Sequence, residues 1–321
     1  MDAALFPAWT DALRRNDFQR AWEISDRSLR EYRECGSVER IRERHLQRVW
    51  RGESLVDKRV LIRCYHGLGD TIQFIRFAKP LREIAREVTV WIQPALVPLL
   101  RGVEGVDRLA PLHDGTADFD FDVDVEVMEL AHALRATPEM ISGRVPYLPR
   151  SRSETARHVT SPLKVGLVWE AGDWNRARSV PVHLLSGLAR QTDARLLSLQ
   201  QGPARLMAPR IPATDVAVCE IETLAARIMA LDLVITVDTM VAHLAGALGA
   251  PVWTMLHHDC DWRWPLRGRE TIWYPTMRLF RQKRTGDWTD VIEELVSELK
   301  AFARRSIFSA ASGAQATSNQ N

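Results

Sequence analysis

Residues 232–253, DLVITVDTMVAHLAGALGAPVW, decide the fold of this chain. The run 232–237 is a short, continuous apolar stretch rich in β-branched residues, which is typical of a buried strand. A turn at Asp238-Thr239 follows, and then a helix that ends near Gly249, since glycine is the usual residue just past a helix C-terminus. Pro251 opens the next strand. The stretch therefore predicts a strand–helix–strand unit of a parallel sheet.

The start of that helix is a candidate anion site. Asp238 and Thr239 lie where helix N–H groups have no partner within the helix, and His243 follows one turn later on the face that carries Thr239. A helix N-terminus favours a negative charge by roughly 0.3 to 1 kcal/mol, and a hydroxyl or imidazole adds donors for the same oxygens. The alternative is a capped helix whose histidine is satisfied in the core.

A second stretch, LIRCYHGLGDTIQF at 61–74, has the same layout of strand, glycine turn and helix. Gly67 and Gly69 allow a sharp turn, and Asp70 begins a helix predicted to run from Asp70 to about Arg86. Two interpretations stay open. Asp70 is either a helix N-cap, which stabilises by about 1 kcal/mol, or a general base toward a hydroxyl at the carboxyl edge of the sheet.

Both stretches belong to a longer alternation of strands and helices, which predicts an α/β protein with parallel sheets. Two similar openings, KRVLIRCYHGLGD and LKVGLVWEAGD, mark two halves. We expect two Rossmann-like domains facing a cleft. The predicted boundaries are a helical N-terminal segment (1–55), a first domain (56–150), a linker (151–162), a second domain (163–303) and a disordered tail (304–321).

Residues 8–34 predict two helices that are broken at Asn16-Asp17. The pattern is that of a single helical hairpin of the tetratricopeptide type, and it puts the apolar positions on one face. One such unit cannot bury its own apolar face, so we expect it to pack on the rest of the chain or to be a remnant of a longer array. The alternative is an N-terminal cap without a partner. A protein partner that binds through these helices is a further prediction.

The composition excludes several classes. A formal charge of +2 over 321 residues argues against a nucleic-acid partner. No apolar run is long enough to span a bilayer and the start lacks the features of a signal peptide, so we expect a cytoplasmic protein. The four cysteines have no metal-ligand spacing, and the acids of DFDFDVDVEV alternate with apolar residues as in a half-buried strand, so no metal site is predicted.

A third patch, WEAGDWNRARSVP, follows the first strand of the second half. Arg176 and Arg178 lie in this loop, and two guanidinium groups beside an anion site are suited to clamp a diphosphate. Near the C-terminus, HHDCDWRWPLRG and WYPTMRLFRQ predict a packed, tryptophan-rich loop at the cleft mouth.

From about residue 58 to 299, the chain resembles the glycosyltransferase family 9 pattern of the ADP-heptose heptosyltransferase-like proteins. The motifs that carry the resemblance are, in order, GLGD, RS-x-P, SLQ-x-G, VDT-x-x-AHLAGALG-x-PVW, DWRW and WYPTMRLFRQ. The resemblance is greatest to the branch often linked to tetratricopeptide repeats. It implies a GT-B fold, in which the second domain holds the donor nucleotide and the first holds the acceptor. It also implies an inverting, metal-independent transfer without a cofactor, from a nucleotide sugar, with an ADP-sugar favoured.

The resemblance implies roles residue by residue. Asp70 matches the general base, Arg178 matches a phosphate-contacting residue, and Gln200 lies near the ribose. The candidate donor-binding residues are Asp238, Thr239, Met240, Val241, His243, Arg176, Arg178, Gln200, Cys219 and Ile221. The candidate acceptor-side turn consists of His66, Gly67, Gly69 and Gln73.

The predicted function is transfer of a heptose or related sugar to a glycan, a lipid-linked glycan or a protein hydroxyl, as in lipopolysaccharide biosynthesis. A peripheral association with the inner membrane is a further expectation. Met240 and Glu170 depart from the family pattern near the donor. Two alternatives therefore stay open: a non-catalytic sugar-nucleotide-binding or scaffold protein with a vestigial cleft, and a nucleotide-sugar epimerase.

Overall fold

A computed structural model describes residues 4–34, 43–44, 48–149, 162–172 and 174–318, the last thirteen of these by their backbone only. The chain forms two compact units. Unit 1 comprises Met1–Pro149 together with Asp261–Pro275, and unit 2 comprises Arg150–Cys260 together with Thr276–Asn321. The linker predicted at 151–162 lies outside the described residues except for Pro162, and so does Asp173.

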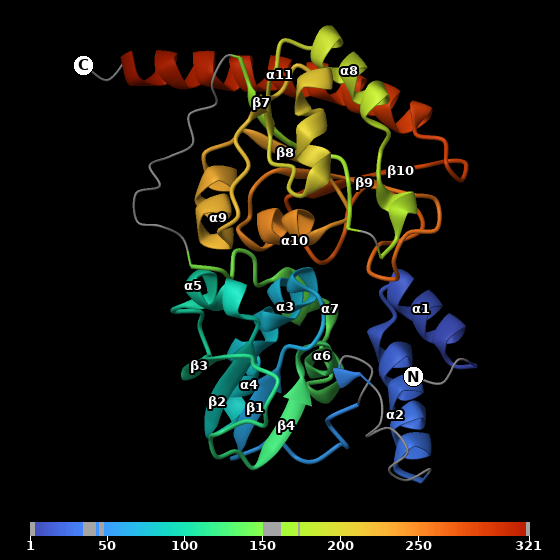
Figure 1. The fold of residues 1–321 in the computed structure, drawn as a ribbon, viewed down its shortest axis with the longest axis vertical. Helices are drawn as coiled ribbons and strands as arrows, with labels where there is room; N and C mark the ends of the chain where they lie inside the picture. Colours follow the sequence, from blue (N-terminus) through green and yellow to red (C-terminus); the bar gives the residue numbers. More distant parts are fainter. Residues whose placement is uncertain (1–3, 35–42, 45–47, 150–161, 173, 319–321) are drawn as a thin grey trace. The chain divides into compact units, whose positions relative to one another are not determined.

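Unit 1 is built on a four-stranded parallel sheet of order β3-β2-β1-β4 (Figure 1). Its centre is apolar because Ile62 of β1 lies opposite Val90 of β2 on one side and Val125 of β4 on the other. The strands are β1 (Arg59–Arg63), β2 (Glu87–Ile92), β3 (Arg108–Pro111) and β4 (Val123–Glu126). The alternating acidic run therefore supplies one short strand only, at its C-terminal end.

The helix expected over 70–86 is broken into three pieces. It begins earlier, with Gly67 as the N-cap, and a 3₁₀ turn interrupts it, so that Pro80 falls in the first turn of a new helix, where its missing N–H has no intrahelical role. The pieces are α3 (Leu68–Phe74), η3 (Ile75–Phe77) and α4 (Ala78–Ile84). The other helical segments of this unit are η4 (Pro94–Leu96), α5 (Val97–Leu100), η5 (Val127–Glu129), α6 (Leu130–Ala133) and α7 (Pro138–Ser142).

The two predicted N-terminal helices are present as α1 (Phe6–Arg14) and α2 (Phe18–Glu34), and Asn16 takes a left-handed conformation (φ 59°) in the turn between them. The apolar face of α2 is buried, and Trp22 donates from Nε1 to the carbonyl oxygen of Ala136, 2.9 Å away. The hairpin is thus packed against the rest of unit 1, next to α6 (Figure 1).

Unit 2 contains a six-stranded parallel sheet of order β10-β9-β8-β5-β6-β7. The helices α8 and α11 pack together on one side, and α9 and α10 pack together on the other (Figure 1). The strands are β5 (Lys164–Val168), β6 (Arg195–Ser198), β7 (Thr214–Asp215), β8 (Leu233–Val237), β9 (Val252–Leu256) and β10 (Met277–Arg281). The helices are η6 (Arg176–Arg178), α8 (Val182–Gln191), η7 (Pro203–Arg210), α9 (Ile221–Met229), α10 (Met240–Ala247) and α11 (Thr289–Ser318).

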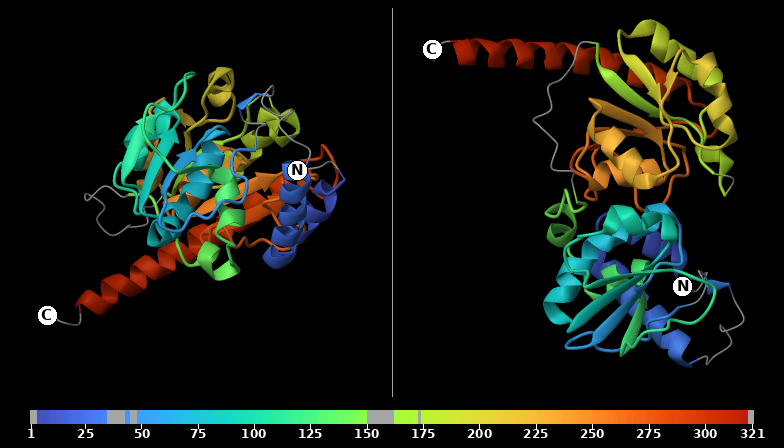
Figure 2. Two further views of the ribbon diagram at one scale, coloured as in Figure 1. Left: turned by 90° about the horizontal axis from the view of Figure 1, so that it is seen from below. Right: turned by 60° about the vertical axis from the view of Figure 1, so that its left-hand side comes forward.

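The strand–helix–strand unit predicted from 232–253 is confirmed as β8, α10 and β9, and Gly249 follows α10 with a φ of 66°. The tail differs from the expectation, because α11 continues as one long helix through residues 304–318, for which no regular structure was expected (Figure 2). In the described part of the chain, no helix is both long enough and apolar enough to cross a membrane.

The segment 261–275 also differs from the expectation. It connects β9 to β10 in sequence, inside the stretch assigned to the second domain, yet it packs with unit 1. Arg76 of η3 is buried and donates from Nη1 to the carbonyl oxygen of Trp273 at 2.9 Å, while the ring of Phe74 lies 5.7 Å from that of Trp273. The predicted packing of this loop is confirmed, since Trp264 and Trp273 are buried.

Candidate functional site

Each sheet reverses its strand order at one point. The reversal lies between β1 and β4 in unit 1, and between β5 and β8 in unit 2. Open α/β sheets bind ligands at the carboxyl ends of the strands that flank such a point, because the loops there diverge to opposite faces. The GLGD turn follows β1, the WEAGDWNRARSVP loop follows β5, and the Asp238-Thr239 turn follows β8. The main motifs found in the sequence therefore mark the two switch points.

Asp70 occupies the third position of α3 rather than its N-cap. Its Oδ2 accepts from the N–H of Gly67, the N-cap residue, at 3.0 Å. Gly67 has an ordinary extended conformation (φ −66°), so the turn does not need glycine for its backbone angles. A Cβ there would lie 3.1 Å from Asp70 Oδ2, so a larger residue would push on this carboxylate. Gly69 lies within α3.

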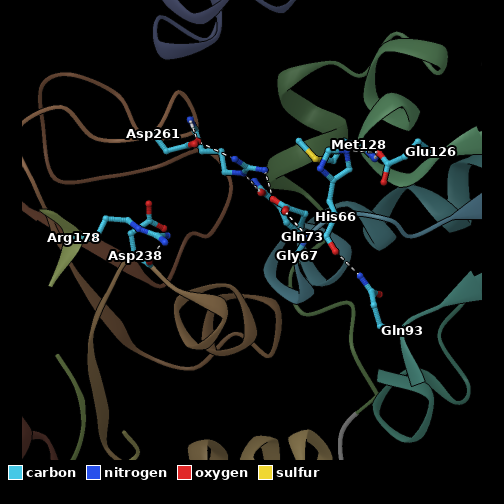
Figure 3. Close-up of polar contacts among 11 residues, drawn as sticks. His66, Gly67, Gln73, Gln93, Glu126, Met128, Arg178, Asp238 and Asp261 are labelled. Atoms are coloured by element: carbon cyan, nitrogen blue, oxygen red, sulfur yellow. Dashed lines mark hydrogen bonds and ion pairs between the residues drawn. The ribbon is translucent and has the colours of Figure 1, made fainter. Parts of the chain in front are cut away.

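The second oxygen of Asp70 is bound by Arg263, which comes from the 261–275 segment. Arg263 Nη2 donates to Asp70 Oδ1, Nε donates to Gln73 Oε1 at 2.6 Å, and Nη1 donates to Asp261 Oδ1 at 2.8 Å (Figure 3). From the sequence, Arg263 and Asp261 fall in the predicted packed loop, where Asp261 was weighed only as a metal ligand, and neither residue has a predicted role beside Asp70. The only signal was the DWRW motif, in which charged and aromatic residues alternate.

Two acids lie at the end of β4, on the other side of the switch point: Glu126 is buried and Glu129 is partly buried. Glu126 is 2% exposed, and its Oε2 accepts from the N–H of Met128 at 2.7 Å and lies 3.6 Å from His66 Nε2 (Figure 3). Burial raises the pKa of Glu126 well above its usual range, and the charges of Glu129 and Asp70 add to this. Burial also raises the pKa of Glu129 to about 7.

Other acids of that run pair with arginines of β1 instead, at exposed or partly buried positions. Asp122 binds Arg59 at 2.8 Å and Asp124 binds Arg63 at 2.6 Å. His66 is held through its carbonyl oxygen, which accepts from Gln93 Nε2 at 2.7 Å. In the described parts of the chain, no group of three or more His, Cys, Asp or Glu side chains is arranged to hold a metal ion.

In unit 2, Thr239 is the N-cap of α10, which begins at Met240, and Thr239 makes no side-chain capping hydrogen bond. The N–H groups of the first turn of a helix, here at Met240 and Val241, have no acceptor within the helix. Thr239 Oγ1 lies 3.4 Å from Thr236 Oγ1, and His243 is buried one turn further on. The carbonyl oxygen of Asp238 accepts from Arg178 Nη1 at 2.9 Å, so the loops after β5 and β8 are joined (Figure 3).

The remaining predicted donor residues have different environments. Gln200 accepts from the N–H groups of Trp169 and Glu170 at 3.0 and 2.9 Å, and it donates to the carbonyl oxygens of Glu170 and Gln201 at 3.2 and 2.9 Å. Its amide therefore braces the loop after β5. Ile221 is buried in the core at the start of α9, whereas Cys219 and Arg176 are exposed.

The comparisons with known proteins agree with this architecture. No family model matches the chain. Protein FlbA of Caulobacter vibrioides is 25% identical over 79% of the chain, and the chain spans about half (48%) of the length of that curated relative.

Solved structures share the fold. A glycosyl transferase of family 9 from Veillonella parvula superposes with a TM-score of 0.56 at 11% identity, covering 79% of this chain and 99% of that one. ADP-heptose lipopolysaccharide heptosyltransferase II of E. coli gives 0.57 at 11% identity, covering 77% and 99%. The iron-containing dodecameric glycosyltransferase TibC of enterotoxigenic E. coli gives 0.51 at 13% identity, covering 79% and 78%. The expected fold class, two Rossmann-like parallel-sheet domains of the GT-B type with N-terminal helices, is confirmed.

Proposed function

We propose that this chain is a family 9 type glycosyltransferase that moves a sugar from a nucleoside diphosphate donor to a hydroxyl group. The observation that carries the proposal is the hydrogen bond from Arg178 to the carbonyl oxygen of Asp238. It brings the RS-x-P loop and the VDT helix start together at the switch point of unit 2, where a phosphate-bearing ligand is expected.

The diphosphate is proposed to lie at the N-terminus of α10. The N–H groups of its first turn and the Thr239 hydroxyl are donors there, and the part of the Arg178 guanidinium that does not bind Asp238 adds positive charge. As the bond between C1 and the diphosphate breaks, negative charge develops on the leaving oxygen. Fixed donors and a cation stabilise that charge without further rearrangement.

Asp70 is the proposed general base. Its carboxylate takes the proton of the acceptor hydroxyl, whose oxygen attacks C1 of the sugar while the nucleoside diphosphate departs on the opposite face. The anomeric configuration is thereby inverted, and no metal is needed for the step. A positioned base of this kind contributes about 10² to 10⁴-fold to the rate.

The donor we favour is an ADP-sugar, with a heptose or related sugar, because heptosyltransferase II of E. coli has the same fold. The acceptor is a glycan, a lipid-linked glycan or a protein hydroxyl, and the proposed location is cytoplasmic or peripheral to the inner membrane. The competing function, a scaffold that recruits a partner through the N-terminal helices, is less favoured, because the apolar face of α2 is already buried within unit 1.

A thermal-shift screen of the full chain with ADP-, GDP-, UDP- and dTDP-sugars tests the donor, since a ligand that binds only the native state raises the melting temperature. We expect a selective shift with an ADP-sugar in the absence of divalent metal. Thr239→Ala should abolish it, whereas Thr223→Ala, an exposed threonine of α9, should not.

Asp70→Asn separates binding from catalysis. It should keep the thermal shift and lose sugar transfer by at least 100-fold. A well-folded wild-type protein that responds to none of these nucleotides would overturn the enzyme proposal and favour the scaffold. Conversion of the donor sugar without any acceptor would indicate an epimerase.

A further inference from the structure

The 261–275 segment brings a buried cation to Asp70. The side chain of Arg263 is only 8% exposed, and all three of its guanidinium nitrogens donate to side-chain oxygens, those of Asp70, Gln73 and Asp261. Asp261 Oδ1 also accepts the backbone N–H of Arg263 at 3.0 Å. A guanidinium that is satisfied on every nitrogen has a defined orientation, because its planar fork fits only one arrangement of acceptors.

The same guanidinium also makes cation–π contacts with two aromatic rings. Its central carbon lies 4.3 Å from the centre of the Trp262 ring and 5.7 Å from that of Phe74. The Trp262 ring is itself in contact with Trp9 of α1, at 4.9 Å between centroids. The position of Arg263 is therefore set in part by packing that includes the N-terminal hairpin.

Arg263 supplies the positive charge that pairs with the acids at this position. The neighbouring carboxyl, Glu126, is buried and its raised pKa favours the neutral form, so Asp70 and Asp261 are the two acids that share the guanidinium. Burying a carboxylate without a cation is costly, and a carboxylate that loses its partner also loses the contact that fixes its orientation.

We propose that Arg263 is a positioning residue for Asp70: it holds Oδ1 and fixes the orientation of the carboxylate, so that the exposed part of the carboxylate meets the acceptor hydroxyl. This inference rests on the proposed function. The N–H of Gly67 fixes Oδ2 in the same way, and 25% of the Asp70 side chain is exposed for that contact. Asp261 orients Arg263 in turn. The segment between β9 and β10 is thereby assigned to the acceptor side of the reaction, although it lies in the C-terminal half of the sequence.

The test compares Arg263→Lys, Arg263→Ala and the control Arg267→Ala, an exposed arginine of the same segment. The readout is release of the nucleoside diphosphate from the nucleotide sugar that gives a thermal shift, measured with water and with simple sugars as acceptors. We expect Arg263→Ala to keep the thermal shift and to lower kcat at least 30-fold. Arg263→Lys should recover part of kcat, and Arg267→Ala should match the wild type.

Two further measurements separate positioning from a general structural defect. Millimolar guanidinium should restore turnover to Arg263→Ala and leave Arg267→Ala unchanged. In an Asp70→Asn background, Arg263→Ala should cause no further loss of turnover, because the residue acts through Asp70. A wild-type kcat for Arg263→Ala, or an undiminished loss in the Asp70→Asn background, would overturn the inference and leave the proposed function standing. A wild-type protein that binds and turns over no nucleotide sugar would overturn both.

Discussion

Arg178 donates from Nη1 to the main-chain oxygen of Asp238 over 2.9 Å, and this bond joins the loops that follow β5 and β8. The two loops approach from opposite sides of the switch point of the unit 2 sheet. The contact uses one edge of the guanidinium to fix the helix start and leaves its positive charge beside the N-terminus of α10. Two features that attract anions thus lie together.

The first prediction concerns this arginine. Arg178→Ala should weaken donor binding at least tenfold, which corresponds to about 1.4 kcal/mol, because it removes both the cation and the bond that holds Asp238. Arg176→Ala is the matched control: it removes an equal charge from the same 3₁₀ turn, but Arg176 is exposed, so we expect at most a threefold change. Isothermal titration with the ADP-sugar measures both. Equal losses would mean that net charge alone, rather than the Arg178–Asp238 contact, governs affinity.

The candidate site was partly predictable from the sequence, for a local reason. The β8–α10–β9 unit is predicted by short apolar runs, a capping position and a terminal glycine that lie within about 25 residues of one another. The RS-x-P loop is recognised from a single short motif. Arg263 was not predictable, because its partner Asp70 is 193 residues away and no local pattern records the pairing. Glu126 was misjudged for another reason. Glu126 is the last acid of the alternating acidic run, and the alternation predicts an exposed side chain there. The end of a parallel strand is covered on both faces, however, so Glu126 is buried.

The partly buried Glu129 predicts a pH dependence of stability. Burial raises the pKa of Glu129 to about 7 in the folded chain. The charge of Arg48 and the N–H groups of Trp50 and Glu126 lower this pKa, but by less than burial raises it. In the unfolded chain the pKa of Glu129 is near the ordinary value of 4.5. Between these two values the folded state binds more protons, so the free energy of unfolding falls as the pH rises from about 4.5 to 7. Above pH 7 this contribution is constant.

Glu129→Gln should remove that fall. Relative to the wild type, the variant should gain about 2–3 kcal/mol at pH 8 and nothing at pH 4, since the neutral amide oxygen still accepts from the N–H groups of Trp50 and Glu126. Urea unfolding at a series of pH values measures the difference, with Glu222→Gln on the exposed face of α9 as the control. Parallel pH curves for wild type and Glu129→Gln would contradict the assignment.

A pair of glycines tests the packing of α4. Gly105 and Gly102 both have a positive φ, 85° and 81°, so alanine is strained by about 1 kcal/mol at either position. The two positions differ in the room available for a Cβ atom. A Cβ at Gly105 would lie 2.5 Å from the backbone of Ala78 and Lys79, whereas at Gly102 nothing lies within 4 Å. Gly105→Ala should therefore cost about 2 kcal/mol more than Gly102→Ala in urea unfolding, because overpacking against backbone adds to the strain. Equal costs would mean that the loop moves away from α4 freely.

The last prediction concerns the N-terminal hairpin as part of unit 1. Trp22 is buried, its ring lies 5.8 Å from that of His132, and its Nε1 donates to the carbonyl oxygen of Ala136. Trp22→Ala should cost about 3–5 kcal/mol in urea unfolding, whereas Phe6→Ala, at an exposed position of α1, should change stability by less than about 0.5 kcal/mol. The hairpin also contacts Trp262, and the guanidinium of Arg263 lies over the ring of Trp262. Trp22→Ala should therefore lower turnover as well. Donor binding in unit 2 should stay unchanged. A stable, fully active Trp22→Ala protein would mean that the hairpin is free to serve a separate partner.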